Sequence, residues 1–399
     1  MHGEFLLHTG LILGALALSA WVFRKAGQSV IPAFILLGMA IRPLMGDSAL
    51  VEEMASLGVV LLLFFMGLEF SLGALFLNRR RILRTGSIDL LICFPVGMVA
   101  GLLMGFSVAG SLLLAGAFYI SSSAIIAKSV IDLRRAAAPE TEVALGILVF
   151  EDLFIALFLA ILSGAVLVVD PSPVAAAFGV GRAILFFGVV VYIALRARPL
   201  LNRMFDRDSD DLFVLMVGAV VLLLSWGAIV AGLSEAIGAF LAGLALAETE
   251  HKDRIEQLFA PLQGLFAAIF FLGFGLSINP AAFATVWKGA IVLVVLGIAA
   301  KVVGGVLAGR SLQMSQRGAL ALGLTLCARG EFSIILAGIA VTVGLHELGA
   351  LIALQVLALS LLGTLAMQFA PEITQRVYPR RQERTLEEQG FSPELAGFE

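Results

Sequence analysis

Residues 147–162 read ILVFEDLFIALFLAIL, and the only charged residues in this run are the neighbours Glu151 and Asp152. An ionised carboxylate inside an apolar helix is costly unless it is paired or neutralised. Successive residues of a helix point about 100° apart, so one counter-charge does not easily cover both carboxylates. The stretch therefore predicts an apolar membrane span that carries a functional site.

The composition is that of a membrane protein. Of the 399 residues, 60% are hydrophobic and 14% are charged, and the mean hydropathy is +1.04. Soluble domains are about 45–50% apolar and about 25% charged, so these values exclude an ordinary soluble protein. They predict an all-α polytopic membrane protein.

The net charge, the cysteines and the histidines indicate which partners and cofactors are not expected. The net charge of -3 gives no reason to expect nucleic acid. Cys93 and Cys327 both lie within apolar stretches, and the four histidines are scattered without the spacing of metal ligands. We therefore expect no disulfide framework, no cofactor and no metal beyond a transported ion.

Apolar runs of about 17–25 residues, the length that crosses the hydrocarbon core, divide the chain into thirteen predicted spans. The first span is followed, not preceded, by its basic residues Arg24 and Lys25, which predicts a retained span and not a cleaved signal peptide. A turn at Gly232 separates the eighth span from the short ninth. The predicted spans are residues 4–23, 29–45, 54–77, 85–107, 110–132, 141–165, 174–197, 210–231, 232–247, 262–279, 284–308, 316–344 and 347–370.

The basic residues predict the orientation of these spans. If the N-terminus is outside, the cytoplasmic loops and the C-terminal tail, with Arg196 at a span edge, hold 20 of the 26 Lys and Arg. The outside loops hold Arg42 and Lys288 alone. This excess predicts an outside N-terminus and a cytoplasmic C-terminus.

An internal repeat is visible at an offset of 206 residues. FFMGLEFSL (64–72) matches FFLGFGLSI (270–278), and PAF (32–34) matches GAF (238–240). The shift of seven spans reverses the orientation of the second copy, as in the inverted repeats of secondary transporters. We expect a transmembrane domain over residues 1–377 and a short tail over 378–399. Within this domain, the repeats are predicted at about 5–165 and 210–370, with a linker helix at about 174–197.

Two spans related by this repeat have interrupted middles. One contains YISSSAIIAK (119–128), with Ser121, Ser122 and Ser123 in succession, and the other contains TLCARGEFS (325–333). Unwound helix at membrane depth is tolerated where it lines a cavity or is covered by protein, and there it offers carbonyl oxygens and helix dipoles to an ion. We expect both spans to be broken helices.

Six ionisable residues are predicted to lie deep in the spans: Glu69, Glu151, Asp152, Lys301, Arg329 and Glu331. Structural pairing is an open alternative for Glu69, Arg329 and Glu331. For Asp152 it is less attractive, because adjacent helical residues point about 100° apart and one partner does not easily cover both Glu151 and Asp152. Burial disfavours the charged form of a carboxylate, while a nearby cation favours it. A proton and a cation can then compete for the carboxylate, which is antiport, and Lys301 is the expected counter-charge.

These residues resemble the monovalent cation:proton antiporter family, and within it the Kef-type potassium/proton branch. The resemblance covers roughly residues 5–370 and is carried by FFMGLEFSL, SSSAIIAKSVID, LVFEDL, GLSEAIGAFLAGLALAET, FFLGFGLSI and RGEFSIILAG. It implies a sodium/proton-antiporter fold in which two broken helices cross, and a homodimer. It also implies that Asp152 binds the ion, that Lys301 is the lysine found in many members, and that Arg329 and Glu331 hold the crossing together.

Two features of the sequence depart from the Kef-type pattern. The residue before the ion-binding aspartate is glutamine in typical Kef proteins and is Glu151 here, which leaves the charge stoichiometry open. Kef proteins also carry a cytoplasmic nucleotide-binding domain, whereas no Gly-rich phosphate loop occurs in the tail of this chain. Nucleotide gating within this polypeptide is not expected, and a separate soluble regulatory subunit is one open possibility.

The sequence thus predicts an inner-membrane antiporter, not an enzyme, that exchanges K+, or Na+, for H+ by alternating access. Asp152 is predicted to bind cation or proton in turn, Glu151 to tune its charge, and the three serines to complete the cation shell. A gated K+ efflux channel and a transport-inactive sensor are the alternatives. An aspartyl protease is disfavoured, because Asp89 is expected near the end of the span 85–107.

Overall fold

The structure is a computed structural model that describes residues 2–26, 28–45, 49–69, 78–135, 137–166, 173–206 and 209–379. In these ranges the chain forms helices and no strand. The helices are α1 (His2–Lys25), α2 (Ile31–Met45), α3 (Ala49–Glu69), α5 (Arg79–Leu103), α6 (Val108–Tyr119), α7 (Ser123–Asp132), α8 (Pro139–Val166), α9 (Pro173–Phe205), α10 (Asp210–Val230), α11 (Glu235–Ala247), α12 (Lys252–Ser277), η1 (Pro280–Ala282), α13 (Phe283–Ser311), α14 (Gln316–Thr325), α15 (Glu331–Thr342), α16 (His346–Gln368) and α17 (Ala370–Val377).

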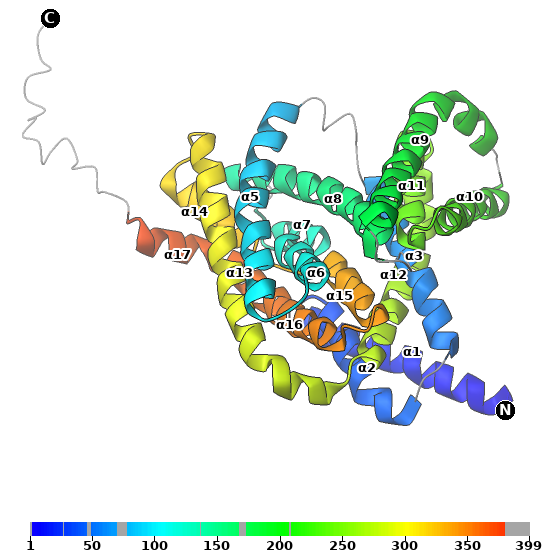
Figure 1. Cartoon of the computed structure of the whole chain (residues 1–399), viewed down its shortest axis with the longest axis horizontal. Coiled ribbons are helices and arrows are strands. Elements are labelled where there is room, and N and C mark those ends of the chain that lie inside the picture. Colours follow the sequence, from blue (N-terminus) through cyan, green and yellow to red (C-terminus); the bar gives the residue numbers. More distant parts are fainter. Residues whose placement is uncertain are drawn as a thin grey trace, which may run out of the picture.

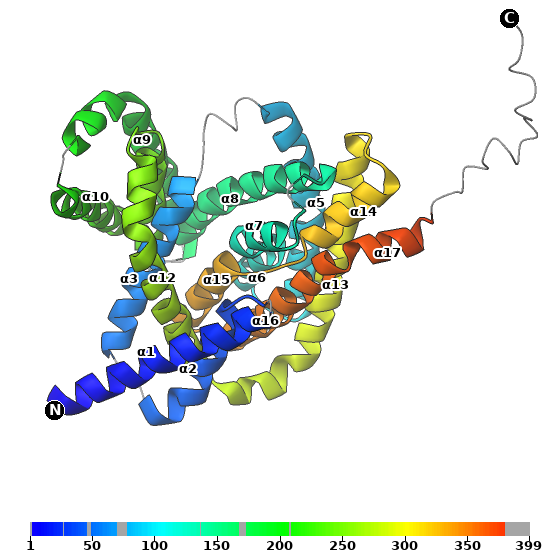
Figure 2. The ribbon, with the colours of Figure 1, turned by 180° about the vertical axis from the view of Figure 1, so that it is seen from behind.

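The helices form two groups that lie side by side (Figures 1 and 2). The first group, here called the core bundle, contains α5–α8 and α13–α16. The second group, here called the panel, contains α1–α3 and α9–α12, in which α3 packs along both α11 and α12. The short helix α17 projects from the core bundle at the end of the described chain.

Each predicted span contains helix in the described residues. Among the described residues, six helical segments are long and apolar enough to cross a membrane, and shorter apolar helices accompany them. The two spans predicted to be interrupted are broken, one between α6 and α7 and the other between α14 and α15. Gly232 forms the predicted turn between α10 and α11 with a φ of +71°, a left-handed conformation that favours glycine.

Glycines allow the panel helices to pack with their backbones in contact. A Cβ at Gly67 of α3 would meet the carbonyl oxygen of Phe240 in α11, and a Cβ at Gly275 of α12 would meet the carbonyl oxygen of Ile35 in α2. Small residues permit such approach between membrane helices. The α2–α12 contact and the α3–α11 contact exchange under the predicted repeat, which agrees with an inverted-repeat fold.

Candidate ion-binding site

The two broken helices cross where their chains are extended. Residues 120–122 link α6 to α7, and residues 326–330 link α14 to α15. The amide of Ser122 donates to the carbonyl of Ala328 at 2.9 Å, and Ser333 Oγ donates to the carbonyl of Ala117 at 2.9 Å. A Cβ at Gly330 would contact the Ser122 side chain, so glycine is needed for this close approach. The prediction of crossed, discontinuous helices is confirmed.

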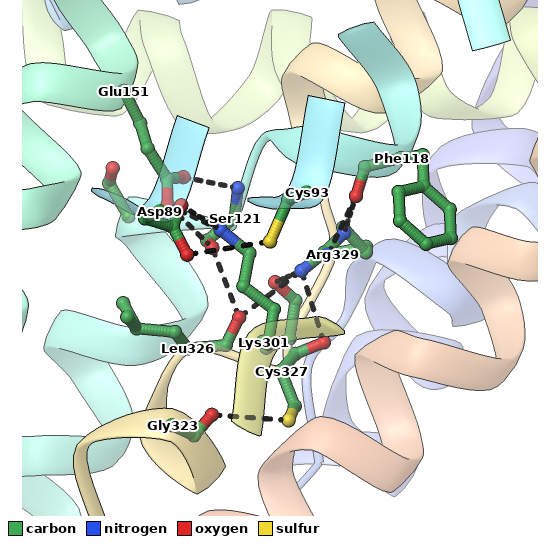
Figure 3. Close-up of polar contacts among 12 residues, drawn as sticks. Asp89, Cys93, Phe118, Ser121, Glu151, Lys301, Gly323, Leu326, Cys327 and Arg329 are labelled. Atoms are coloured by element: carbon green, nitrogen blue, oxygen red, sulfur yellow. Dashed lines mark hydrogen bonds and ion pairs between the residues drawn. The ribbon is translucent and has the colours of Figure 1, made fainter. Parts of the chain in front are cut away.

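Arg329 serves the carboxyl ends of both amino-terminal half-helices. Its Nε and Nη2 donate to the carbonyl of Phe118 at 3.0 and 2.7 Å, and its Nη1 donates to the carbonyl of Leu326 at 3.1 Å. The side chain is fully buried, and Figure 3 shows it pointing toward Phe118. Helix carboxyl ends carry unpaired carbonyls and partial negative charge, and a guanidinium satisfies both. Arg329 therefore holds the crossing through carbonyls.

The three consecutive serines each contact a different carboxylate. Ser121 donates to Glu151 through its amide at 2.5 Å and its hydroxyl at 3.1 Å. Ser122 Oγ donates to Glu331 Oε2 at 2.8 Å. Ser123 Oγ lies 3.0 and 3.2 Å from the two carboxylate oxygens of Asp152. The break between α6 and α7 therefore brings three carboxylates to one short segment.

Lys301 joins two buried carboxylates beside this segment (Figure 3). Its Nζ lies 2.6 Å from Asp89 Oδ2 on α5 and 2.7 Å from Glu151 Oε1 on α8, and all three side chains are fully buried. The ring of Tyr119 lies 5.0 Å from the same ammonium. A buried charge is stable only when it is paired and hydrogen-bonded, as each of these three is.

Asp89 is a site residue that the sequence interpretation missed. The predicted span began at residue 85, which placed Asp89 near a membrane surface, but α5 begins at Arg79 and Asp89 is fully buried within it. The basic cluster at 79–84 hid the start of the helix. No spacing in the sequence indicates this contact. In the structure, Gly304 lies one turn after Lys301 and leaves room for the carboxylate, since a Cβ there would meet Asp89 Oδ1 at 2.9 Å.

The remaining predicted residues lie in different surroundings. Asp152 is partly buried beside Ser123. Glu331 is buried and contacts Ser122. Glu69 is the last residue of α3, and its side chain lies outside the described residues.

Two cavities lie between the core bundle and the panel. One, of about 490 Å³, is lined by the amino-terminal part of α3 and the carboxyl-terminal parts of α12 and α15. The other, of about 390 Å³, is lined by the opposite parts of α3 and α12, by α7, and by Glu331. They share no lining residue, and the neighbours Phe270 and Phe271 of α12 face different cavities.

Crossed broken helices, buried carboxylates at the crossing and separate cavities on either side define a secondary transporter of the inverted-repeat class. The pattern of the family described as "Sodium/hydrogen exchanger, transmembrane" matches residues 12–370. The chain therefore belongs to the sodium/hydrogen exchanger family.

Relatives in sequence and structure agree with this assignment. The chain is 39% identical over 394 residues to the K(+)/H(+) antiporter subunit KhtU of Bacillus subtilis (strain 168), covering 93% of this chain and 94% of that protein. It is 33% identical over 384 residues to the ammonium/H(+) antiporter subunit AmhT of Alkalihalophilus pseudofirmus, covering 96% and 97%. The sodium proton antiporter MjNhaP1 of Methanocaldococcus jannaschii shares the fold, with a TM-score of 0.71, 16% identity, and coverage of 94% of this chain and 100% of that structure.

Proposed function

We propose that this protein exchanges a monovalent cation, K+ in preference to Na+, for H+ across the bacterial inner membrane. One observation carries the proposal: Asp152 lies beside Glu151 at the crossing of two broken helices, where Ser123 contacts its carboxylate. A partly buried carboxylate at such a crossing can hold either a hard cation or a proton. Competition between the two for Asp152 couples their movements in opposite directions.

The neighbouring side chains have distinct roles in this proposal. Glu151 accepts from Lys301 and from Ser121, which fixes this carboxylate, while Asp152 binds the transported ion. Ser123, with Ser121, Ser122 and the carbonyls of the extended segment, supplies oxygen ligands of the kind that K+ and Na+ accept. Lys301 bonds a carboxylate when the cation is absent.

The preference for K+ rests on the relatives. The two relatives described above are named for K+/H+ and for ammonium/H+ exchange. K+ and NH4+ are of similar size, so a site that fits one fits the other better than the smaller Na+. A more distant relative, GerN of Bacillus cereus, is named a Na(+)/H(+)-K(+) antiporter, which keeps Na+ as the second cation to test.

The two cavities support transport by alternating access, because they lie at opposite ends of α3 and α12 along the boundary between the core bundle and the panel. Movement of the core bundle against the panel would open one and close the other. Lipid or a second copy of the chain would cover the exposed apolar side chains of α9 and α10, among them Phe178, Leu185, Leu215 and Trp226. The proposal includes a homodimer. It also includes an outside N-terminus, which the distribution of basic residues predicts. A soluble cytoplasmic subunit would add regulation.

Proteoliposomes with an acidic interior test the function directly. Purified protein is reconstituted with a lumenal pH dye, and K+, Na+ or choline is added outside. We expect K+ to alkalinise the lumen with wild-type protein and with Glu142→Gln, a change to an exposed carboxylate on the same helix α8. Asp152→Asn is expected to abolish the response, since its amide cannot exchange a cation for a proton.

Two results would overturn the proposal. A wild-type protein that responds to neither K+ nor Na+ would favour the sensor, and an Asp152→Asn protein as active as wild type would remove Asp152 from the transport cycle. Repeating the assay with valinomycin reports the net charge moved per cycle. Cation flow without proton movement would favour the channel.

A further inference from the structure

We propose a second monovalent-cation site at Glu331, which captures the transported cation on the side of the 390 Å³ cavity before it reaches Asp152. This inference rests on the proposed function, because it names a step that precedes binding at Asp152. Its ligand class is a hard, weakly hydrated monovalent cation such as K+ or Rb+.

The first observation is an unpaired carboxylate oxygen. Glu331 is 2% exposed, yet within the described part of the chain its Oε1 has no hydrogen-bond partner. Buried carboxylate oxygens are normally paired, and leaving one unpaired costs about 1–3 kcal/mol or more. Because Glu331 lines the cavity, a mobile ligand that enters from there can supply the missing contact.

The second observation is how the rest of Glu331 is held. Its Oε2 accepts from Ser122 Oγ at 2.8 Å, and Glu331 is the first residue of α15. The positive end of a helix dipole stabilises a carboxylate in its charged form. Arg329 is the nearest arginine in sequence. Its guanidinium donates to the carbonyls of Phe118 and Leu326, so it does not neutralise Glu331. Oε1 is therefore available to a cation, whose charge would favour the ionised carboxylate that burial disfavours.

The cavity itself has the size and lining for a hydrated cation. Its volume of about 390 Å³ exceeds by far the roughly 30 Å³ that one water occupies in the liquid. Gln28, Ser129 and Thr364 add oxygen atoms to a largely apolar wall. Gln28 Oε1 is also buried and has no hydrogen-bond partner among the described residues, so a second carbonyl-type ligand faces the same space. The basic residue on the lining, Arg24, is exposed and can extend into water.

The location explains what the site would do. The positive-inside distribution predicts that this cavity lies on the cytoplasmic side, since its lining includes Arg24 in the last turn of α1 and Gln28 in the loop that follows. Ser122 contacts Glu331, and its neighbour Ser123 contacts Asp152. Two consecutive serines therefore connect Glu331, where the cation would be captured, with Asp152, the proposed transport carboxylate. Occupancy at Glu331 would raise the local supply of cation to Asp152.

Binding of radioactive Rb+ to purified protein tests the site without relying on transport. Asp152→Asn is expected to keep saturable binding at about half the wild-type capacity, because one of two carboxylate sites remains. Adding Glu331→Gln to that variant is expected to remove binding. Glu256→Gln, an equal change of charge on the cytoplasmic end of α12 and outside the cavity lining, is the matched control.

Transport gives an independent measure. In proteoliposomes, Glu331→Gln is expected to raise the Rb+ concentration for half-maximal proton movement from the cytoplasmic side about tenfold, with the maximal rate less affected. Glu256→Gln is expected to match wild type. Two results of the binding assay would contradict the capture site. One is an Asp152→Asn protein that binds no Rb+, and the other is a double variant that binds as much Rb+ as Asp152→Asn.

The two proposals fail separately. Wild-type protein that moves no protons removes the exchange function, whereas the Rb+ capacity of Asp152→Asn still reports on Glu331. Normal exchange with a half-saturating Rb+ concentration unchanged in Glu331→Gln removes the capture site alone. The Asp152→Asn arm leaves Glu331 intact, so the test survives if Glu331→Gln does not fold.

Discussion

The two broken helices cross at one place but differ in charge. The break between α6 and α7 contains Ser121 and Ser122 and no charge, whereas the break between α14 and α15 contains Arg329 and is followed at once by Glu331. Both breaks leave the same backbone groups unpaired, because each produces one carboxyl end and one amino end. One guanidinium satisfies the carboxyl ends, and carboxylates of α8 and α15 lie at the amino ends. An internal repeat can thus keep its backbone architecture while only one copy carries the charge.

The largest effect is expected at the carboxyl ends. Arg329→Met would leave the buried carbonyl of Phe118 without its donors and the carbonyl of Leu326 with the Ser121 hydroxyl alone. It would also remove the one guanidinium that serves both helix carboxyl ends. We expect little folded protein on size-exclusion chromatography and a lower melting temperature than wild type. Arg310→Met, at the exposed end of α13, is the control. Equal stability of the two variants would show that the crossing does not need its arginine.

The second largest effect is expected in the buried charge cluster of Lys301, Asp89 and Glu151, beside the break between α6 and α7. Lys301→Met would leave Asp89 and Glu151 buried without a cation, a change that typically costs about 3–5 kcal/mol. Asp89→Asn would leave one carboxylate for one ammonium, so we expect a clearly smaller loss of unfolding free energy. Melting temperatures of the two variants measure this order. A reversed order would mean that Asp89, and not Glu151, is the main partner of Lys301.

Single hydroxyl deletions sharpen the comparison between the serines. Ser122→Ala would remove the hydrogen bond to Glu331 and reduce stability by about 1.5–3 kcal/mol, the usual worth of a bond to a charged group. Ser123→Ala would remove a contact of Asp152, so we expect weaker cation affinity in proteoliposomes and a smaller change in melting temperature. Equal effects of both variants on affinity would make Ser122 as important a ligand of the transported ion as Ser123.

The smallest effect is expected at the surface of the core bundle. Arg81 on α5 and Glu142 on α8 form an ion pair at 2.6 Å with side chains 38% and 69% exposed. Water and salt screen such pairs, so Arg81→Ala is expected to change the unfolding free energy by less than about 1 kcal/mol. A loss as large as that of Lys301→Met in a thermal melt would contradict the contrast between buried and exposed pairs.

The sequence by itself determined the backbone plan. Apolar length predicted the spans, the offset of 206 residues indicated the inverted repeat, and the polar interruptions marked both breaks. These features are local, because a span must satisfy its own backbone and bury its own apolar residues. The same reasoning identified a set of charged residues deep in the predicted membrane spans, since few charges occur in apolar runs. They are Glu151, Asp152, Lys301, Arg329 and Glu331. The roles assigned to them stay predictions.

Only the tertiary structure decided which of these groups meet. Lys301 lies 212 residues from Asp89 and 150 from Glu151, and nothing in the spacing of one helix indicates which face of another will oppose it. The partners of Arg329 are carbonyls, which every residue carries and no sequence pattern marks. Pairing across helices depends on how whole helices pack, and packing is set by all of the contacts together.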